Sequence, residues 1–279
     1  MLQTGQILGA YRLGKLLGRG GMGTVHAGTR LGDGQPVAIK ALHGGLLVGP
    51  ERDTMIGRFR QEAEIGLQLR HPGIVQVLEH GEQDDLLYLI MERIEGRELR
   101  ALLGEGRSQP LTRALDIILQ LLNALGYAHG HGVIHRDLKP ANIMLREDQS
   151  LVIMDFGIAR MADLDLTHTG ELLGSPAYMA PEQLRGARVD QRVDLFAAGL
   201  LLYQLLTGRR AFLADSLAAL MLQLLQEEPP PPSSLNPDLP ASLDGILRQA
   251  LAKEPAQRFA SAQTFAAALR PLQPTPSDR

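Results

Sequence analysis

The sequence contains no cysteine and no tryptophan among its 279 residues. Without cysteine the chain cannot form disulfides, thiolate zinc sites or iron–sulfur clusters, and it has no cysteine nucleophile. It also lacks a basic excess, because 28 Lys and Arg stand against 31 Asp and Glu, giving a formal net charge of −3. Nucleic-acid-binding proteins usually carry a basic excess or a basic stripe, so we expect no nucleic-acid partner.

Long hydrophobic runs are absent as well. The longest apolar stretch, residues 195–206, is about a dozen residues long and contains Gln204, whereas a membrane-spanning helix needs roughly 20 apolar residues. The N-terminal residues lack the charged start and apolar block of a signal peptide. We therefore expect no membrane segment in this chain and interpret residues 195–206 as a buried core helix.

The first 95 residues have the pattern of a β-rich lobe. Residues 11–40 alternate short apolar runs with turn residues, which predicts an antiparallel β-meander. Residues 51–70 are charged, with apolar residues at three- and four-residue steps, which predicts a helix. Residues 75–94 predict two more strands around a polar turn at residues 82–85. Residues 1–95 are therefore predicted to form a five-stranded sheet with one helix.

The remaining chain has a mainly helical pattern, so the predicted fold class is α+β with two lobes. Short strands are expected at Ile143–Leu145 and Leu151–Ile153, and helices at residues 112–130, 192–207, 214–227, 241–253 and 261–270. The four prolines at 229–232 favour a rigid loop between helices over a polyproline ligand. We assign residues 96–272 to this larger helical lobe and residues 273–279 to a frayed tail or the start of a linker.

A glycine-rich motif lies near the N-terminus. Gly18, Gly20, Gly23 and Val25 match the pattern G-x-G-x-x-G-x-V. Glycine lets backbone amides approach a phosphate closely and permits positive φ in a tight turn. The dinucleotide-binding form of this motif is followed by a helix, but here a β-type sequence follows. The pattern predicts a strand–loop–strand flap over nucleotide phosphates, with a plain glycine-rich hairpin as the alternative.

Four further motifs follow in order. Lys40 ends an apolar strand fifteen residues after Val25, and Glu62 in the predicted helix could pair with it, although a strand-end lysine often points to solvent. Residues 135–142 match H-R-D-x-x-x-x-N. Asp155-Phe-Gly lies thirteen residues beyond Asn142, and Ala180-Pro-Glu comes later. Each motif alone is weakly specific, but the five in this order are a specific signal.

This ordered set resembles the protein kinases, and most closely the eukaryotic-like serine/threonine kinases of bacteria, from about Tyr11 to about Leu272. The resemblance implies a two-lobed kinase fold with a β-rich N-lobe and a larger helical C-lobe. It also implies transfer of the ATP γ-phosphate to Ser and Thr hydroxyls of proteins, with Mg²⁺, or Mn²⁺ in its place. Signal transduction and activation by autophosphorylation are expected on the same ground.

The resemblance also implies roles for single residues. Asp137 would accept the proton of the substrate hydroxyl or orient that hydroxyl, and Lys139 would stabilise charge on the transferred phosphoryl group. Glu62 would pair with Lys40, while Asn142 and Asp155 would hold the metal. The residues implied to bind ATP are Leu17, Gly18, Gly20, Gly23, Val25, Ala38, Lys40, Met91, Glu92, Ile94 and Met144.

Other residues receive regulatory or structural roles from the resemblance. Thr167 and Thr169 would be autophosphorylated, and Arg136 could bind the resulting phosphate. Ser175 would bridge Asp137 and Lys139. Asp194 would bond the backbone at residues 135–136, and Glu182 would form a buried ion pair with Arg258.

Two features are less typical. The pair His129 and His131 invites a metal interpretation, but without a carboxylate cluster we expect both to be surface residues. Gly66 stands where the family usually has an apolar side chain, which predicts a mobile helix. On that interpretation, Gly66→Leu raises basal activity.

Alternative functions are a nucleotide-binding pseudokinase or scaffold and a small-molecule kinase on the same scaffold. The first is disfavoured because Lys40, Glu62, Asp137, Asn142 and Asp155 are all present, and the second because residues 174–182 would shape a peptide-docking surface. We expect protein substrates and a transient homodimer. We also expect a cytoplasmic location, either for a complete kinase or for the cytoplasmic domain of a membrane kinase.

Overall fold

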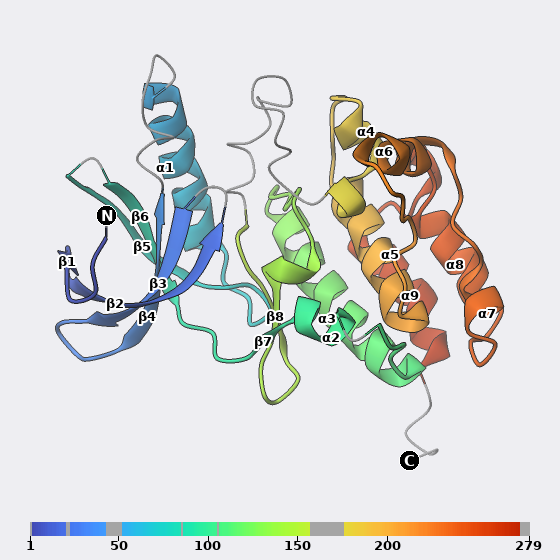
Figure 1. Ribbon diagram of the computed structural model, residues 1–279, viewed down its shortest axis with the longest axis horizontal. Helices are drawn as coiled ribbons and strands as arrows, with labels where there is room; N and C mark the ends of the chain where they lie inside the picture. Colours follow the sequence, from blue (N-terminus) through green and yellow to red (C-terminus); the bar gives the residue numbers. More distant parts are fainter. Residues whose placement is uncertain are drawn as a thin grey trace. The chain divides into compact units, whose positions relative to one another are not determined.

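The computed structural model describes residues 2–20, 23–42, 52–84, 86–104, 106–156 and 176–273. The chain divides into two compact units. The sheet unit comprises residues 2–95 together with Phe156, and the helical unit comprises residues 96–155 and 176–273 (Figure 1). The predicted tail beyond Gln273 lies outside the described residues.

The sheet unit contains a six-stranded sheet in the order β1-β2-β3-β4-β6-β5, in which all neighbouring strands are antiparallel. Its strands are β1 Ile7–Leu8, β2 Tyr11–Gly20, β3 Gly23–Arg30, β4 Pro36–Leu42, β5 Val77–Gln83 and β6 Leu86–Glu92. The predicted meander is confirmed, but the prediction of five strands is wrong because β1 was missed. Two residues are too short to show a periodic pattern, and β1 exists because Leu8 pairs with Tyr11 and is buried.

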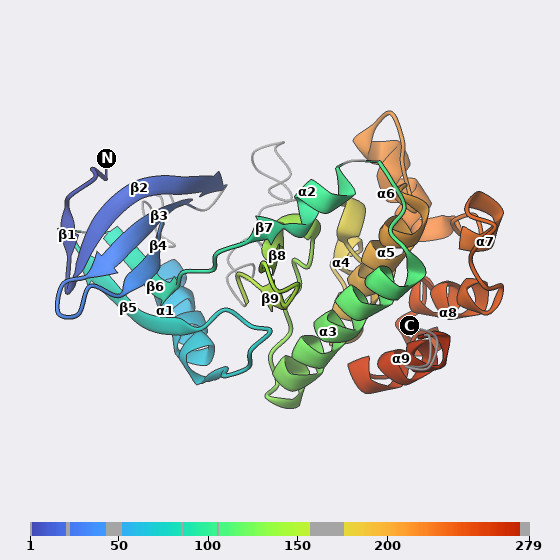
Figure 2. The ribbon, with the colours of Figure 1, turned by 90° about the horizontal axis from the view of Figure 1, so that it is seen from below.

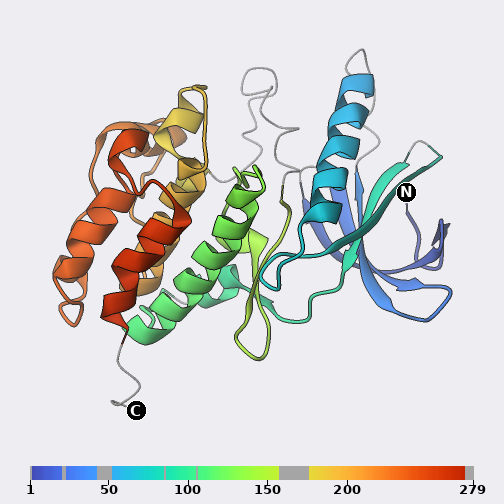
Figure 3. The ribbon, with the colours of Figure 1, turned by 180° about the vertical axis from the view of Figure 1, so that it is seen from behind.

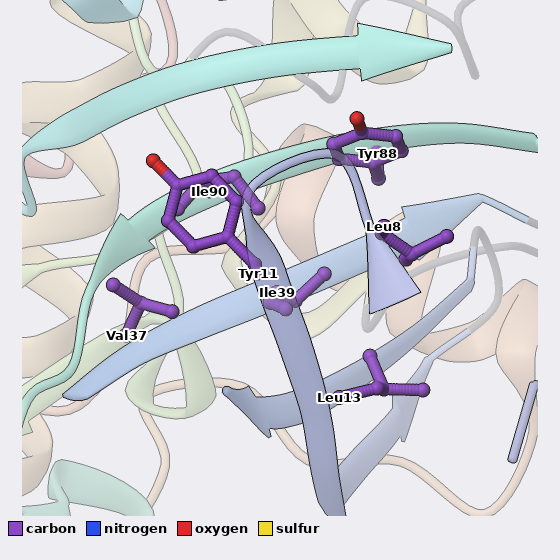
Figure 4. Close-up of a cluster of buried hydrophobic side chains, with 7 residues drawn as sticks. All are labelled: Leu8, Tyr11, Leu13, Val37, Ile39, Tyr88 and Ile90. Atoms are coloured by element: carbon purple, nitrogen blue, oxygen red, sulfur yellow. The ribbon is translucent and has the colours of Figure 1, made fainter. Parts of the chain in front are cut away.

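One face of this sheet carries a compact apolar cluster. Side chains alternate between the two faces along each strand, so residues two apart share a face. The cluster contains Leu8, Tyr11, Leu13, Val37, Ile39, Tyr88 and Ile90 (Figure 4). The N-terminal residues fasten to this region, since Gly5 N donates to Leu13 O (2.7 Å) and Leu13 N donates to Gln6 O (2.8 Å). The side chains of Ala38, Lys40 and their strand partners lie on the opposite face of the sheet.

The helix α1 Arg52–Gln68 packs against β5 within the sheet unit (Figure 1). Gly66 is buried there, and a Cβ built on it would lie 2.8 Å from Cγ2 of Val77. A contact that short requires the neighbouring atoms to move. Close packing against Val77 thus explains the glycine at position 66, because a larger side chain there would have to displace the Val77 side chain. The expectation that Gly66→Leu raises activity stays a prediction.

The helical unit is built around α3 and α5. The helix α3 lies beside both α5 and α9 (Figure 3). A three-stranded sheet, in the order β7-β8-β9, lies within the same unit (Figure 2). The helices and strands of this unit are β7 Arg97–Glu98, α2 Leu99–Leu103, α3 Leu111–Gly130, β8 Ile143–Leu145, β9 Leu151–Ile153, α4 Pro181–Leu184, α5 Arg192–Thr207, α6 Leu217–Gln226, α7 Pro232–Leu235, α8 Ser242–Ala250 and α9 Ala262–Leu269.

The predicted helices of this unit are present; α5 has the predicted bounds, and the other four differ from prediction at one or both ends. The helix α6 begins at Leu217 instead of residue 214 because the Ser216 side chain accepts a hydrogen bond from Ala219 N and caps the helix. Residues 229–231 lie between helices, as predicted, whereas Pro232 begins α7, and Tyr203 Oη donates to Pro230 O (3.0 Å). Nearly every residue of α5 is buried. Among the described residues, none of the helices has both the length and the apolar character needed to cross a bilayer.

Candidate active site

The predicted ATP-binding residues of the sheet unit share one face of the sheet. Val25 pairs with Lys40, and Ala38 pairs with Met91, so the two pairs on neighbouring strands project to the same side. Lys40 is only 8% exposed, which is unusual for a lysine. Strand register therefore aligns an ammonium group with three apolar side chains on the face opposite the apolar cluster.

The glycines of the glycine-rich motif differ in whether their surroundings leave room for a side chain. Gly18 pairs with Val25 near the end of β2, and a Cβ built on it would meet nothing within 4 Å. A Cβ on Gly23, in contrast, would collide with the backbone carbonyl of Ala41 in the adjacent strand. Neither residue has a positive φ, so the conformational reason offered from sequence does not apply to them. Glycine is needed at position 23 because the adjacent strand lies too close for a Cβ, whereas position 18 has room for one.

The chain segment that follows β6 is anchored at Glu92. Its N–H donates to Gln76 O, and its side-chain Oε1 accepts from Gln76 N, both at 2.9 Å. Because this N–H is used within the protein, the backbone carbonyl is the group of Glu92 that suits a hydrogen bond to an adenine edge. Ile94, two residues further on, is half-buried.

In the helical unit, Asp194 organises the loop that contains the H-R-D motif. Asp194 is 1% exposed, and it accepts hydrogen bonds from His135 N at 2.9 Å and Arg136 N at 2.8 Å, as the resemblance implies. Burial alone raises the pKa of Asp194, but the hydrogen bond and charge of His129 and the backbone hydrogen bond from His135 hold that pKa below its usual value. Its carboxylate is therefore a fixed, ionised anchor for this loop.

His129 is a correction to the sequence analysis, which placed it on the surface. Its side chain is 4% exposed, and Nε2 bonds Oδ2 of Asp194 at 2.8 Å. His131 is exposed, and its Nδ1 bonds Tyr127 O. The described residues contain no group of three or more His, Asp or Glu that could hold a metal ion.

His135 connects the same loop to the end of β9. Its Nε2 bonds Met154 O at 2.9 Å, while Nδ1 accepts from Asp137 N at 3.3 Å. These partners assign the proton to Nε2, because a carbonyl can only accept and an amide can only donate. The imidazole therefore fixes Asp137 relative to Met154, the residue before Asp155.

Asp137, Lys139 and Asn142 form a polar cluster. Oδ2 of Asp137 contacts Lys139 Nζ at 2.6 Å and accepts from Asn142 Nδ2 at 3.1 Å. The same Asn142 nitrogen donates to the Asp137 carbonyl at 2.8 Å. The Asp137 side chain is 31% exposed, so a carboxylate with a neighbouring positive charge is presented at the surface of this unit.

Asn142 and Asp155 fit a divalent metal by their chemistry. The amide nitrogen of Asn142 is directed to Asp137, which leaves Oδ1 as the side-chain atom suited to a cation. Met154 N donates to Asn142 O at 2.8 Å, so Asp155 directly follows a residue bonded to Asn142. One amide and one carboxylate oxygen suit Mg²⁺, which is commonly bound by few protein oxygens together with substrate phosphates.

Glu182 and Arg258 form the expected buried ion pair. Both terminal guanidinium nitrogens of Arg258 bond the carboxylate at 2.7 Å, and both residues are at most 5% exposed. Arg258 also donates to the carbonyls of Ala252, Arg192 and Lys253. The pair therefore ties α4 to the segment between α8 and α9.

Some predicted residues cannot be placed. Thr167, Thr169 and Ser175 lie outside the described residues, as do the two residues between Gly20 and Gly23. Glu62 belongs to α1, but its side chain is not among those described, so its pairing with Lys40 stays a prediction. Leu17 is exposed and Met144 is half-buried in β8.

Sequence reasoning missed Gln183. Its side chain accepts from Ala180 N and donates to Arg136 O. A glutamine at the third position of a helix, next to the Ala180-Pro-Glu motif, is a typical capping signal. Its second bond, to a residue 47 positions away, has no sequence signal.

Comparison with known proteins gives consistent matches. A family model described as the protein kinase domain matches residues 11–269. A probable serine/threonine-protein kinase of Streptomyces coelicolor is 41% identical over 91% of this chain and 38% of its own length. The serine/threonine-protein kinase PknB of Mycolicibacterium smegmatis is 40% identical, covering 93% of this chain and 42% of the relative. PrkC of Bacillus subtilis is 35% identical, covering 97% and 41%. The chain thus spans about two fifths of the length of these relatives.

Proposed function

The chain belongs to the protein kinase domain family, and we propose that it is a serine/threonine protein kinase domain that transfers the γ-phosphate of ATP to protein Ser and Thr hydroxyls. The observation that carries this proposal is the cluster of Asp137, Lys139 and Asn142 on a loop bonded to Asp194. The similar relatives, which are named serine/threonine-protein kinases, support the same hydroxyl acceptor.

The helical unit supplies the groups for transfer. Asp137 orients the substrate hydroxyl and accepts its proton, because its carboxylate is partly exposed and held by Asn142. Lys139, bonded to Asp137, places a positive charge where the transferred phosphoryl group carries negative charge. Phosphoryl transfer is accelerated mainly by such positioning and electrostatic stabilisation.

The sheet unit supplies groups for ATP. Val25 and Ala38 contact the adenine, with Met91 behind them, and the backbone of residues 92–94 bonds its edge. Lys40, paired with Glu62, orients the α- and β-phosphates under the loop of Gly18, Gly20 and Gly23. The shared face of Val25, Ala38, Lys40 and Met91 supports this assignment.

Asn142 and Asp155 hold the divalent cation, which we assign as Mg²⁺ with Mn²⁺ as a substitute. When bound, such a cation neutralises charge on the phosphate oxygens. The residues themselves contribute by orientation, since the Asn142 amide is fixed by Asp137 and Asp155 follows the anchored Met154.

The proposed regulation is autophosphorylation. Autophosphorylation at Thr167 or Thr169 would add a charge of roughly −1.5 to −2, which Arg136 is suited to bind. Trans-autophosphorylation would use the expected transient homodimer. We also propose a cytoplasmic location.

The test is phosphate transfer by the purified chain. After phosphatase treatment, the chain receives ATP and Mg²⁺, with and without dephosphorylated casein, and products are measured by intact mass and peptide mapping. We expect phosphate on casein and on Thr167 or Thr169, and a rate lower by about 10²–10⁴-fold in Asp137→Asn.

Asp238→Asn, at an exposed aspartate of the helical unit, is the matched control and should keep full activity. A folded wild-type chain that binds ATP but transfers phosphate neither to itself nor to casein would contradict the proposal. That outcome would favour the nucleotide-binding pseudokinase.

A further inference from the structure

The backbone on both sides of Arg136 is held at three points. Arg136 N donates to Asp194 Oδ1 (2.8 Å), Arg136 O accepts from Gln183 Nε2 (2.7 Å), and Asp137 N donates to His135 Nδ1 (3.3 Å). Arg136 has φ 66°, in the left-handed region that non-glycine residues rarely occupy. A conformation of this kind persists only where surrounding groups hold it.

Gln183, from a different part of the chain, donates the hydrogen bond to the Arg136 carbonyl. It is half-buried in α4, directly after Glu182, whose ion pair with Arg258 anchors that helix. Its Oε1 accepts from Ala180 N at 3.0 Å, which leaves Nε2 pointing to Arg136 O. One amide group therefore bonds the segment ending in Ala180 to the loop that carries Asp137.

This double role restricts the chemistry of the side chain. It must accept from one backbone N–H and donate to one backbone carbonyl at the same time, which a neutral amide does. A carboxylate can only accept, and an ammonium group can only donate. The structure thus gives a reason for an amide at position 183 that helix capping alone does not, because a carboxylate would cap equally well.

We propose that Gln183 is a positioning residue for phosphoryl transfer, acting through the Arg136 carbonyl on the orientation of the Asp137 carboxylate. The proposal rests on the proposed function, since it assumes that Asp137 acts on the substrate hydroxyl. Gln183 itself touches no reacting group. It holds the peptide that joins Arg136 to Asp137, and without it that peptide can rotate away from the transfer-competent orientation.

Gln183→Glu separates the two bonds of the side chain. The carboxylate has the same shape and keeps an acceptor for Ala180 N, but it places an oxygen against the oxygen of Arg136. We expect kcat for casein phosphorylation to fall by about tenfold, the size that corresponds to one lost hydrogen bond in the transition state. KM for ATP and the urea midpoint of unfolding should stay near the wild-type values. Gln183→Met, which loses both bonds, should lower kcat to a similar extent.

Gln191→Glu is the matched control. Gln191 Nε2 donates to the Ala260 carbonyl at 2.7 Å, so the same substitution disturbs the same kind of bond outside the H-R-D loop. Its kcat should equal that of the wild type.

Two results would overturn the inference. The first is a Gln183→Glu variant with wild-type kcat; if Gln183→Met then still lowers kcat, the role belongs to capping of Ala180. The second is an equal loss of kcat in Gln191→Glu. Asp137→Asn is measured in parallel, and its inactivity would show that the proposed function stands even if the role of Gln183 fails.

Discussion

The sheet unit and the helical unit fix their proposed functional residues by different means. In the sheet unit, Val25, Ala38 and Lys40 are aligned by backbone pairing between strands. In the helical unit, Arg136 and Asp137 lie on a loop whose backbone groups are bonded by side chains: Asp194 and Gln183 of distant helices bond Arg136, and His135 of the same loop bonds Asp137. The first arrangement depends on how closely strands approach, and the second depends on polar partners.

This difference follows from what each backbone can do for itself. Strands satisfy their N–H and carbonyl groups through the ladder, so register alone sets which side chains share a face. A loop has no ladder, and its partly buried polar groups need partners from elsewhere. The stability of the sheet unit should therefore be most sensitive to added side-chain volume. The stability of the helical unit should be most sensitive to the loss of a buried polar partner.

The largest effect is expected from breaking the ion pair in the helical unit. Arg258→Leu leaves the Glu182 carboxylate buried without its partner and removes three bonds to backbone carbonyls. The free energy of unfolding should fall by about 3–5 kcal/mol. Urea denaturation followed by circular dichroism measures this change.

Two variants sharpen that test. Arg185 pairs with Glu254 at 3.5 Å in an exposed position, and Arg185→Leu should change the free energy of unfolding by less than about 1 kcal/mol. The double variant with leucine at 182 and 258 should lose less than Arg258→Leu alone, because it leaves no buried charge unpaired. Equal losses for Arg185→Leu and Arg258→Leu would contradict the importance of burial.

A smaller effect is expected in the sheet unit when a methyl group is added at Gly23. The collision with Ala41 O forces β3 and β4 apart, and overpacking of this kind costs about 1–3 kcal/mol of unfolding free energy. Gly18→Ala is the control, since nothing lies within 4 Å of the added carbon. Gly18→Ala should keep the wild-type stability while raising KM for ATP. Thermal unfolding and ATP titration of both variants separate the two roles, and equal stability would refute the steric argument.

The sequence predicts those elements whose structure is determined by residues close together in the chain. The meander of the sheet unit, the strands at residues 143–145 and 151–153, and the helix α5 follow from periodicity within one segment. The motifs around Asp137 and Asp155 also combine residues that are near in sequence. Strands β1 and β7 were missed because two residues carry no period.

Other features depend on partners that are distant in the sequence. His129 was expected at the surface because the sequence shows only that it lies near the end of a helix. Its bond to Asp194, which explains its burial, joins residues 65 positions apart. Gln183 and Arg136 are 47 positions apart. Gly66 was interpreted as a weak point of a helix because Val77 approaches it only in the folded sheet unit. No local pattern can reveal these contacts.

The smallest change in unfolding free energy is expected from alanine substitutions at two glycines of α1. Gly57 is exposed and would meet nothing within 4 Å, whereas Gly66 is buried beside Val77. Alanine is favoured over glycine inside a helix by about 1 kcal/mol, so Gly57→Ala should raise the free energy of unfolding by up to that amount. Gly66→Ala gains the same helix propensity but must displace Val77, so it should give no gain or a net loss. Equal stabilisation of both variants would show that β5 yields easily, and the interpretation of Gly66 as a mobile point in the helix would then be favoured.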